Sequence, residues 1–382
     1  MKLICTQENL NKGLSIVSHI ANKNANLPIL GNVLIKAENK TIKLSTTDLE
    51  MGINCIIRGK VKEEGNFTVQ AKLLKDYTSL LPKEQVDIEL EKQNLSLKCK
   101  NFKTKIKGIS EEDFPLIPKI EKEDGALCKT EKLKKAIQQV IFAVDLSGTR
   151  PELSGVLFKF DTQKKELILA ATDSYRLAEK TITLEKSPQE DKKAIVPVKT
   201  LQELLRILTE DLEASEIEIY LSENQVLFSI NGIEVISRLV DSEYPDYKQI
   251  IPIDFKTKVT LEVESIIKVV KSISLFCRQG INDIYFELKY LKKKAKEKNN
   301  LVSGEMMINA VSSQVGENTS RFPVEFLGEE NNIIFNWRYL LDGLSNIDSQ
   351  SVILEIVDKN SPGILRPKDK KDYIYIIMPI RQ

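Results

Sequence analysis

Histidine is almost absent from this chain, because His19 is the only one among 382 residues. One histidine cannot build a multi-histidine metal site, and its apolar neighbours predict a helix in which His19 has a structural or surface role. The five cysteines are scattered, odd in number and without a C-x-x-C spacing, which argues against a disulfide framework and a zinc site. We therefore expect no bound metal and a reducing compartment, the cytoplasm.

Long apolar runs and an excess of one charge are also missing. No stretch approaches the roughly 20 apolar residues that span a bilayer, and the N-terminus turns polar too soon for a signal peptide. The 56 Lys and Arg residues almost cancel the 55 Asp and Glu residues, which leaves a net charge of +1. This sum argues against a strongly basic nucleic-acid binder, but it does not exclude a local basic surface.

The motifs that carry common enzyme chemistry are absent as well. The sequence has no G-x-x-x-x-G-K-[ST] phosphate loop, no G-x-G-x-x-G turn, no H-E-x-x-H pair and no G-x-S-x-G nucleophile turn. The acidic runs Glu111–Asp113 and Glu329–Glu330 are interpreted as solvated turns. We predict a protein without a catalytic site or cofactor, and an enzyme with an unrecognised carboxylate site is the alternative.

What the sequence does contain is a threefold repeat. A chain of 382 residues exceeds the roughly 250–300 residues of a single core, so several domains are expected. One helical pattern places a glutamate four residues before a lysine, with apolar residues at helical spacing. It occurs at Glu8–Val17, Glu131–Val140 and Glu264–Ile273.

A second helical pattern follows each first one, at Val69–Asp76, Val196–Glu203 and Phe335–Asp342. Alternating segments between the helices predict about eight short strands in each repeat. We therefore predict an α+β fold of three similar domains, 1–124, 125–253 and 254–382, each with two helices packed on antiparallel sheets. The lysine-rich segment Lys292–Asn300 is interpreted as a loop insertion in the third domain.

A polar turn at Thr172–Arg176 stands out because it combines Asp173 with Tyr175 and an arginine. Asp173 can simply cap the turn backbone, whereas tyrosine and arginine are frequent at binding hot spots. The first repeat has a related turn at Thr47–Met51 without those two residue types. The apolar C-terminal segment Met378–Gln382 directly follows a predicted strand, and we expect it to dock on a surface.

Taken together, several segments resemble the bacterial DNA polymerase III β subunit family, the sliding clamps. The resemblance covers essentially the whole chain, and it rests on Leu27–Asn32, Thr47–Met51, Asp113–Pro115, Ala171–Ala178, Leu239–Asp241, Tyr244–Tyr247 and Met378–Arg381. It implies a non-catalytic processivity factor of DNA replication. It also implies a head-to-tail homodimer that forms a ring around duplex DNA, with helices inside and sheets outside.

The resemblance further implies a pocket for short linear motifs of partner proteins. These partners would be the DNA polymerase III α subunit, the clamp loader, other polymerases and repair proteins. The positions that match the pocket are Leu153, Thr172, Tyr175, Arg176, Leu177, Pro245, Ile250, Asn336, Tyr339, Met378, Pro379, Ile380 and Arg381.

Basic residues that recur in the helix repeats are the candidates for contact with DNA. Phosphate contacts carry no sequence information, which suits a protein that slides. The DNA-facing candidates are Lys12, Lys23, Lys72, Lys135, Arg150, Lys199, Lys268 and Arg338. Each can instead merely pair with a neighbouring acid, and a scaffold that binds only proteins would lack such a basic face. On the clamp hypothesis, the near-zero net charge sums a basic lining and an acidic exterior.

Overall fold

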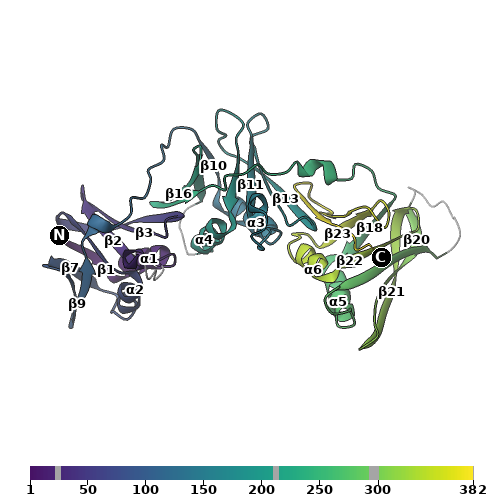
Figure 1. Cartoon of the computed structure of the whole chain (residues 1–382), viewed down its shortest axis with the longest axis horizontal. Helices are drawn as coiled ribbons and strands as arrows, with labels where there is room; N and C mark the ends of the chain where they lie inside the picture. The colour runs from purple at the N-terminus through teal and green to yellow at the C-terminus, as the bar shows by residue number, and fades with distance from the viewer. Residues whose placement is uncertain (22–26, 210–214, 292–300, 382) are drawn as a thin grey trace. The chain divides into compact units, whose positions relative to one another are not determined.

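The computed structural model describes residues 1–21, 27–209, 215–291 and 301–381 (Figure 1). The predicted Lys292–Asn300 loop, Lys23 and Gln382 lie outside the described residues. The chain forms two compact units. Unit 1 comprises Met1–Glu131, Leu184–Gln189 and Lys199–Leu239, and unit 2 comprises Lys132–Thr183, Glu190–Val198 and Val240–Gln382. The second predicted domain, 125–253, therefore contributes residues to both units.

Both repeated sequence patterns form helices, as predicted. The first pattern forms α1 (Gln7–Val17), α3 (Thr130–Ile141) and α5 (Val263–Ser274), and the second forms α2 (Ala71–Ser79), α4 (Val198–Thr209) and α6 (Trp337–Ser345). In Figure 1, α1 lies beside α2, and α5 lies beside α6.

Helix α1 illustrates how the sequence specifies these helices. The Thr6 side chain caps its start by accepting a hydrogen bond from the Asn9 backbone N–H at 3.2 Å. Its apolar residues Leu10 and Leu14 are buried against the sheet. Gly13 faces the same way, and a Cβ there would lie 2.4 Å from Ile57 Cγ2, so the glycine permits the close approach of helix and sheet.

Unit 1 is built on a 13-stranded antiparallel sheet in the order β10-β15-β16-β17-β4-β3-β2-β6-β9-β8-β7-β1-β5. Its strands are β1 (Lys2–Thr6), β2 (Asn32–Glu38), β3 (Thr41–Thr47), β4 (Met51–Ile57), β5 (Gly59–Glu63), β6 (Gly65–Gln70), β7 (Gln85–Glu91), β8 (Asn94–Cys99), β9 (Phe102–Ile109), β10 (Gly125–Lys129), β15 (Glu216–Leu221), β16 (Gln225–Ile230) and β17 (Ile233–Arg238).

Unit 2 is built on a 12-stranded antiparallel sheet in the order β14-β11-β12-β13-β25-β24-β23-β18-β21-β20-β19-β22. Its strands are β11 (Gly155–Asp161), β12 (Glu166–Thr172), β13 (Arg176–Thr183), β14 (Lys193–Pro197), β18 (Thr257–Glu262), β19 (Asp283–Tyr290), β20 (Leu301–Ser312), β21 (Gly316–Gly328), β22 (Asn331–Asn336), β23 (Ser351–Ile356), β24 (Gly363–Pro367) and β25 (Tyr373–Ile377). The predicted α+β fold is confirmed.

Strands from neighbouring repeats join in both sheets. In unit 1, β4 of the first repeat pairs with β17 of the second, with Gly52 opposite Ile236. In unit 2, β13 of the second repeat pairs with β25 of the third, with Leu177 opposite Ile376. Each repeat therefore extends the sheet of the one before it, and the two junctions share one design.

Candidate partner pocket and nucleic-acid interface

The polar turn between β12 and β13 is held by its own side chains. Thr172 Oγ1 donates to the Arg176 carbonyl at 2.6 Å and accepts from the Ser174 N–H at 3.1 Å. Asp173 Oδ1 accepts from the N–H groups of Tyr175 and Arg176 at 2.9 and 3.0 Å. Asp173 therefore does cap the backbone, and the same turn leaves the Tyr175 side chain 62% exposed.

Arg176 is the hub of this site. Its guanidinium donates to Asp173 at 2.9 Å, to the Phe142 carbonyl at 2.8 Å and to the Asp342 carboxylate. It also lies 4.7 Å from the ring centroid of Tyr339, within cation–π range. Burial lowers the pKa of Arg176, but Tyr375 and the carboxylates of Asp342 and Asp173 outweigh it and raise that pKa. The positive charge of Arg176 is therefore held between β13 and α6 by its acidic partners.

The C-terminal segment docks beside this turn, as the sequence predicts. The Met378 N–H donates to the Tyr175 carbonyl at 2.8 Å, and the Ile380 N–H donates to the Ile334 carbonyl at 2.9 Å. The rings of Tyr175 and Tyr339 stack with centroids 6.3 Å apart. Aromatic rings, an arginine and the terminal segment are therefore brought to one surface of unit 2.

An apolar floor lies under this surface. Leu177 and Ile376 face each other across β13 and β25. Both belong to a buried cluster that includes Tyr247 and against which Tyr244 packs. The Tyr247 hydroxyl donates to the Glu179 carboxylate, and burial raises the pKa of Tyr247 above its ordinary range. These tyrosines anchor the segment that carries two more of the predicted residues, Pro245 and Ile250.

The other predicted pocket residues have defined places in unit 2. Leu153 is buried in a short 3-10 helix, and Asn336 ends β22 and caps α6 by accepting from the Arg338 N–H at 3.0 Å. Pro379 lies next to Met378 and is half-buried, whereas Arg381 is exposed. Ile250 is 42% exposed and ends a short 3-10 helix.

Two residues at the hub were not predicted from the sequence. Phe142 contributes its carbonyl and Asp342 its carboxylate to Arg176. Asp342 occupies the acidic position of the second helix pattern, where an ion pair with Arg338 is the alternative to a DNA-facing role for that arginine. The recurrence of an acidic residue at this position of the helix pattern is the one signal in the sequence. It does not predict that Asp342 binds an arginine 166 residues away in the chain.

The described DNA-facing candidates are all exposed. Those on helices are Lys12, Lys72, Lys135, Lys199, Lys268 and Arg338. Arg150 lies outside the helices and donates to the Ser174 hydroxyl at 2.8 Å, which places it at the polar turn of unit 2. The repeat therefore presents basic side chains to solvent from the helices of both units.

Pairing within the helix explains little of this pattern. Lys268 lies 3.8 Å from Glu264 four residues earlier, whereas Lys199 lies 4.0 Å from Glu50 and Lys135 binds Asp348. Exposed pairs of this kind contribute about 0–1 kcal/mol each. Local ion pairing alone therefore does not account for basic residues at matching places in three repeats.

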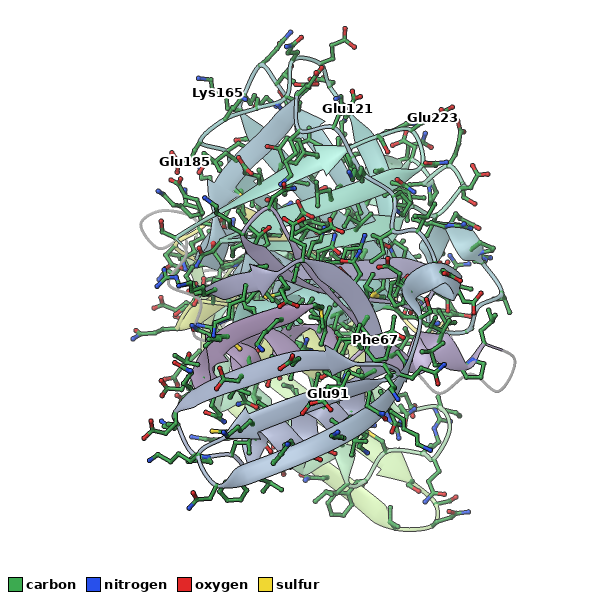
Figure 2. All side chains as sticks on the ribbon, turned by 90° about the vertical axis from the view of Figure 1, so that its left-hand side faces the viewer. Phe67, Glu91, Glu121, Lys165, Glu185 and Glu223 are labelled. Atoms are coloured by element: carbon green, nitrogen blue, oxygen red, sulfur yellow. The ribbon has the colours of Figure 1, made fainter. Side chains whose placement is uncertain are left out.

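Several exposed acidic side chains lie in loops. Glu121, Glu185 and Glu223 of unit 1 are exposed and lie outside the helices and strands. Figure 2 shows them at the margin of the ribbon. Exposed acidic side chains also occur on the helices, at Glu8, Glu131 and Glu264, so the two signs of charge are interspersed along the chain.

In each unit, one strand in the interior of the sheet order leaves most of one edge without a strand partner among the described residues. In unit 1, β9 pairs with β8 along its length, but with β6 only at Gly108 and Ile109. In unit 2, β21 pairs with β20, but with β18 only at Phe326–Gly328. A cavity of about 1000 Å³ adjoins the β21 edge, between that strand and α5. Exposed strand edges are templates for pairing with another chain.

Two further features bear on function. Within residues 1–21, 27–209, 215–291 and 301–381, no group of three or more His, Cys, Asp or Glu side chains is arranged to hold a metal ion. No helix in the same ranges is long and apolar enough to cross a membrane.

Comparison with known proteins gives consistent matches along the chain. Residues 1–118, 128–246 and 248–381 match the models of the N-terminal, central and C-terminal domains of the DNA polymerase III beta subunit. The beta sliding clamp of Synechococcus elongatus is 31% identical over 387 residues, covering 100% of this chain and 99% of that protein. The beta sliding clamp of Bacillus subtilis is 27% identical over 391 residues, and the match covers 100% of this chain and 100% of that protein.

Solved structures agree with these sequence matches. The DNA polymerase III subunit beta from Pseudomonas aeruginosa has a TM-score of 0.91 at 27% identity, with 100% of both chains covered. The DNA polymerase sliding clamp from Bacillus subtilis has a TM-score of 0.90 at 26% identity, covering 100% of this chain and 99% of that one.

Proposed function

This chain belongs to the DNA polymerase III beta subunit family, and we propose that two copies of it close head to tail into a ring around duplex DNA. It is a DNA sliding clamp, a non-catalytic processivity factor of replication. It acts on DNA inside the cell, and the cytoplasm is the compartment that we propose.

The observation that carries the ring proposal is the threefold repeat. Each repeat supplies two amphipathic helices with exposed basic residues, and each junction joins two repeats through one continuous sheet. We assign the domains to residues 1–124, 125–253 and 254–382. Two such chains would supply six similar domains, which suits a closed ring whose helices line one face.

The same repeat supports a sequence-independent DNA interface. Lysine and arginine side chains that contact phosphates contribute affinity without base readout, so they hold DNA without stopping at particular sequences. We propose that Lys12, Lys72, Lys135, Lys199, Lys268 and Arg338 line the ring, with Lys23 as a further candidate. Arg150, which binds Ser174, is better placed at the partner pocket.

The two open strand edges support the head-to-tail closure. In a contact between different surfaces, β9 of one copy would pair with β21 of the other, and two such contacts close a ring. Strand β9 offers the exposed Lys103 and Lys107, and β21 offers the exposed Glu317 and Glu325 against a single exposed Arg321. The two edges are therefore complementary in net charge. The cavity beside β21 would receive apolar side chains of the neighbouring copy.

The aromatic and arginine cluster of unit 2 supports the partner pocket. We propose that it receives short linear motifs from the replicative polymerase, the clamp loader and repair proteins. Tyr175 is exposed but held in place by its turn, and the apolar floor around Leu177 offers a place for an aliphatic anchor. This combination of rigid aromatic groups and an apolar floor is typical of a peptide-binding site.

Charge removal on the helices tests the DNA interface. A variant with Lys72, Lys199, Lys268 and Arg338 changed to glutamine should bind DNA more weakly. Its affinity should also depend less steeply on salt, with a slope reduced by up to about 0.9 for each phosphate that the variant no longer neutralises. The control changes four exposed lysines outside the helices, Lys60, Lys62, Lys164 and Lys165, to glutamine. Equally weakened binding in both variants, measured by fluorescence anisotropy with duplex DNA, would contradict the assignment.

A further inference from the structure

Unit 1 contains a second copy of the polar turn that shapes the partner pocket. Thr47 Oγ1 donates to the Met51 carbonyl at 2.8 Å and accepts from the Leu49 N–H at 3.1 Å. Asp48 Oδ1 accepts from the N–H groups of Glu50 and Met51 at 3.0 and 2.8 Å. The residue at the tip is left-handed in both turns, with φ 79° at Leu49 and 76° at Ser174. The two turns therefore match bond for bond.

The strands beside the two turns match as well. The Arg238 N–H donates to the Glu50 carbonyl at 3.0 Å, just as the Met378 N–H donates to the Tyr175 carbonyl at 2.8 Å. Ile236 thus corresponds to Ile376 of the partner pocket. A segment with an aromatic–proline pair crosses each sheet. In unit 1 the pair is Phe114-Pro115, and Ile120 follows five residues after the proline. In unit 2 the pair is Tyr244-Pro245, and Ile250 follows at the same spacing.

A cavity of about 710 Å³ occupies this matching place in unit 1. It lies between the segment 111–122 and the sheet, and its apolar lining includes Pro115, Ile120 and Ile236. Ile120 packs on the buried cluster that contains Ile236. A volume in this range is typical of sites that enclose a small ligand or a short peptide segment.

One substitution distinguishes the two cavities. Gly52 stands where unit 2 has Leu177, and a Cβ at Gly52 would lie 2.8 Å from Ile117 Cγ2. Ile117 therefore packs over the strand at this point, so the apolar wall of the unit 1 cavity comes from the crossing segment itself. The cavity is a related but different binding surface, and it shares no residue with the partner pocket.

The polar lining of the unit 1 cavity is rich in lysine. Lys36 and Lys43 lie directly opposite each other on β2 and β3, and Lys119 and Lys122 come from the crossing segment. Two like charges directly opposite each other on neighbouring strands destabilise a sheet. Fold stability therefore does not explain why Lys36 and Lys43 stand at these two positions. Burial lowers the pKa of Lys43; Glu234 opposes this shift, and Lys119, Lys36 and Lys122 add to it.

Four lysines and three glutamates, Glu111, Glu112 and Glu234, line the cavity, so part of the positive charge is left uncompensated. Glu234 accepts hydrogen bonds from Lys122 at 2.9 Å and from Asn54 at 3.1 Å, whereas its distance to Lys43 is 3.9 Å. Glu111 Oε1 accepts from Asn66 at 3.1 Å, but its enclosed Oε2 has no donor among the described residues. The cavity therefore offers cationic donors beside an apolar wall and one enclosed acceptor.

We propose that this cavity is a second peptide-docking site, which takes an extended segment of a partner protein that carries a carboxylate next to an aliphatic side chain. The carboxylate pairs with Lys43 and Lys36, the aliphatic side chain packs on Ile120 and Ile236, and a backbone N–H of the segment satisfies Glu111 Oε2. The site goes beyond the partner pocket, which offers a single half-buried arginine and tyrosine rings. It gives each chain a second, chemically different place to hold a partner.

Methyl NMR on the full-length protein labelled at the isoleucine δ1 carbons tests this proposal. The probe is the blocked peptide acetyl-Asp-Leu-Asp-Leu-amide, and its Asn-Leu-Asn-Leu counterpart is the control peptide. We expect saturable shifts at Ile120 and Ile236 with the acidic probe. The dissociation constant should rise about tenfold in Lys43→Gln, because this variant removes a hydrogen bond to the peptide carboxylate. It should rise by a smaller factor in Lys119→Gln, because this variant removes a positive charge from the cavity lining. Lys119 is exposed, so its variant keeps the test valid if Lys43→Gln folds poorly.

The matched control variant is Lys159→Gln, since Lys159 holds in unit 2 the place that Lys36 holds in unit 1. It should leave probe affinity unchanged. The proposal is overturned by the absence of saturable shifts up to about 5 mM probe, which would detect millimolar binding. Equal shifts with the Asn peptide or with inorganic phosphate, or shifts confined to Ile250 and Ile376, would overturn it too. None of these results would affect the ring proposal, which retention on circular DNA tests separately.

Discussion

At the scale of single residues, the proposed partner pocket depends on one half-buried arginine. Arg176 joins the polar turn to α6 through Asp173 and Asp342, and it places its guanidinium against Tyr339. A lysine could not reproduce this planar set of donors. The exposed Tyr175 owes its fixed position to the same turn, so binding residues and positioning residues can be separated by mutation.

Tyr175→Ala should lower the affinity for a peptide from the DNA polymerase III α subunit about tenfold, because truncating an aromatic anchor removes more than about 1 kcal/mol of binding energy. Its melting temperature should stay near that of the wild type, since the side chain is exposed. Glu50→Ala, at the matching place in the turn of unit 1, is the control.

Deleting Met378–Gln382 should abolish binding of the same peptide while the dimer persists. Unchanged peptide affinity in fluorescence anisotropy would remove the pocket assignment.

A second residue-scale prediction concerns acid stability. Hydrogen bonds from Lys135 and Lys370 lower the pKa of Asp348 from 3.8 to about 2. A depressed carboxyl pKa stabilises the fold above the unfolded value, and this contribution disappears as the pH falls from about 4 to about 2. Because Asp348 is 40% exposed, we expect less than about 1 kcal/mol.

Urea unfolding of the wild type and of Asp348→Asn at several pH values measures this contribution. The wild type should be the more stable protein at pH 7, and the difference should shrink below about pH 4. Asp161→Asn, which removes a surface pair with Lys164 at 3.5 Å, is the control. A difference that stays constant down to about pH 2 would contradict the role of the lysine pair.

At the scale of helices and strands, prediction from sequence succeeded where the signal is local. Apolar residues at i, i+4 and i+7 identified the repeat helices, because that spacing creates one buried stripe on each. The polar turn was recognisable from Asp173 for the same reason. The pairings of β4 with β17 and of β13 with β25 were not predictable, because they join segments far apart in the chain and no local pattern encodes their register.

The open edges of β9 and β21 likewise became visible only in the sheet order. Their proposed pairing predicts that Phe322→Glu, in the wall of the cavity beside β21, raises the dimer dissociation constant at least about tenfold, because it puts a charge into an apolar contact. Val311→Glu is the control, since Val311 is 55% exposed outside that cavity. Sedimentation velocity measures the change, and dimers of equal strength in both variants would count against this interface.

At the scale of the whole molecule, neutrality and DNA binding are compatible. The described DNA-facing candidates on the helices are exposed, and the acidic residues Glu121, Glu185 and Glu223 lie on loops (Figure 2). With a Debye length near 8 Å at physiological salt, DNA inside a ring would respond mainly to its lining. The family was recognisable from short motifs, whereas the contacts of Arg176 with Phe142 and Asp342 required the folded chain.

The central claim is that the chain holds DNA by encircling it. The most direct measurement loads labelled protein onto a nicked circular plasmid with its clamp loader, isolates the complex, and cuts the plasmid once with a restriction enzyme. The account predicts that the protein stays on the intact circle and leaves the linear DNA by sliding off its ends. Equal retention on circular and linear DNA would contradict it.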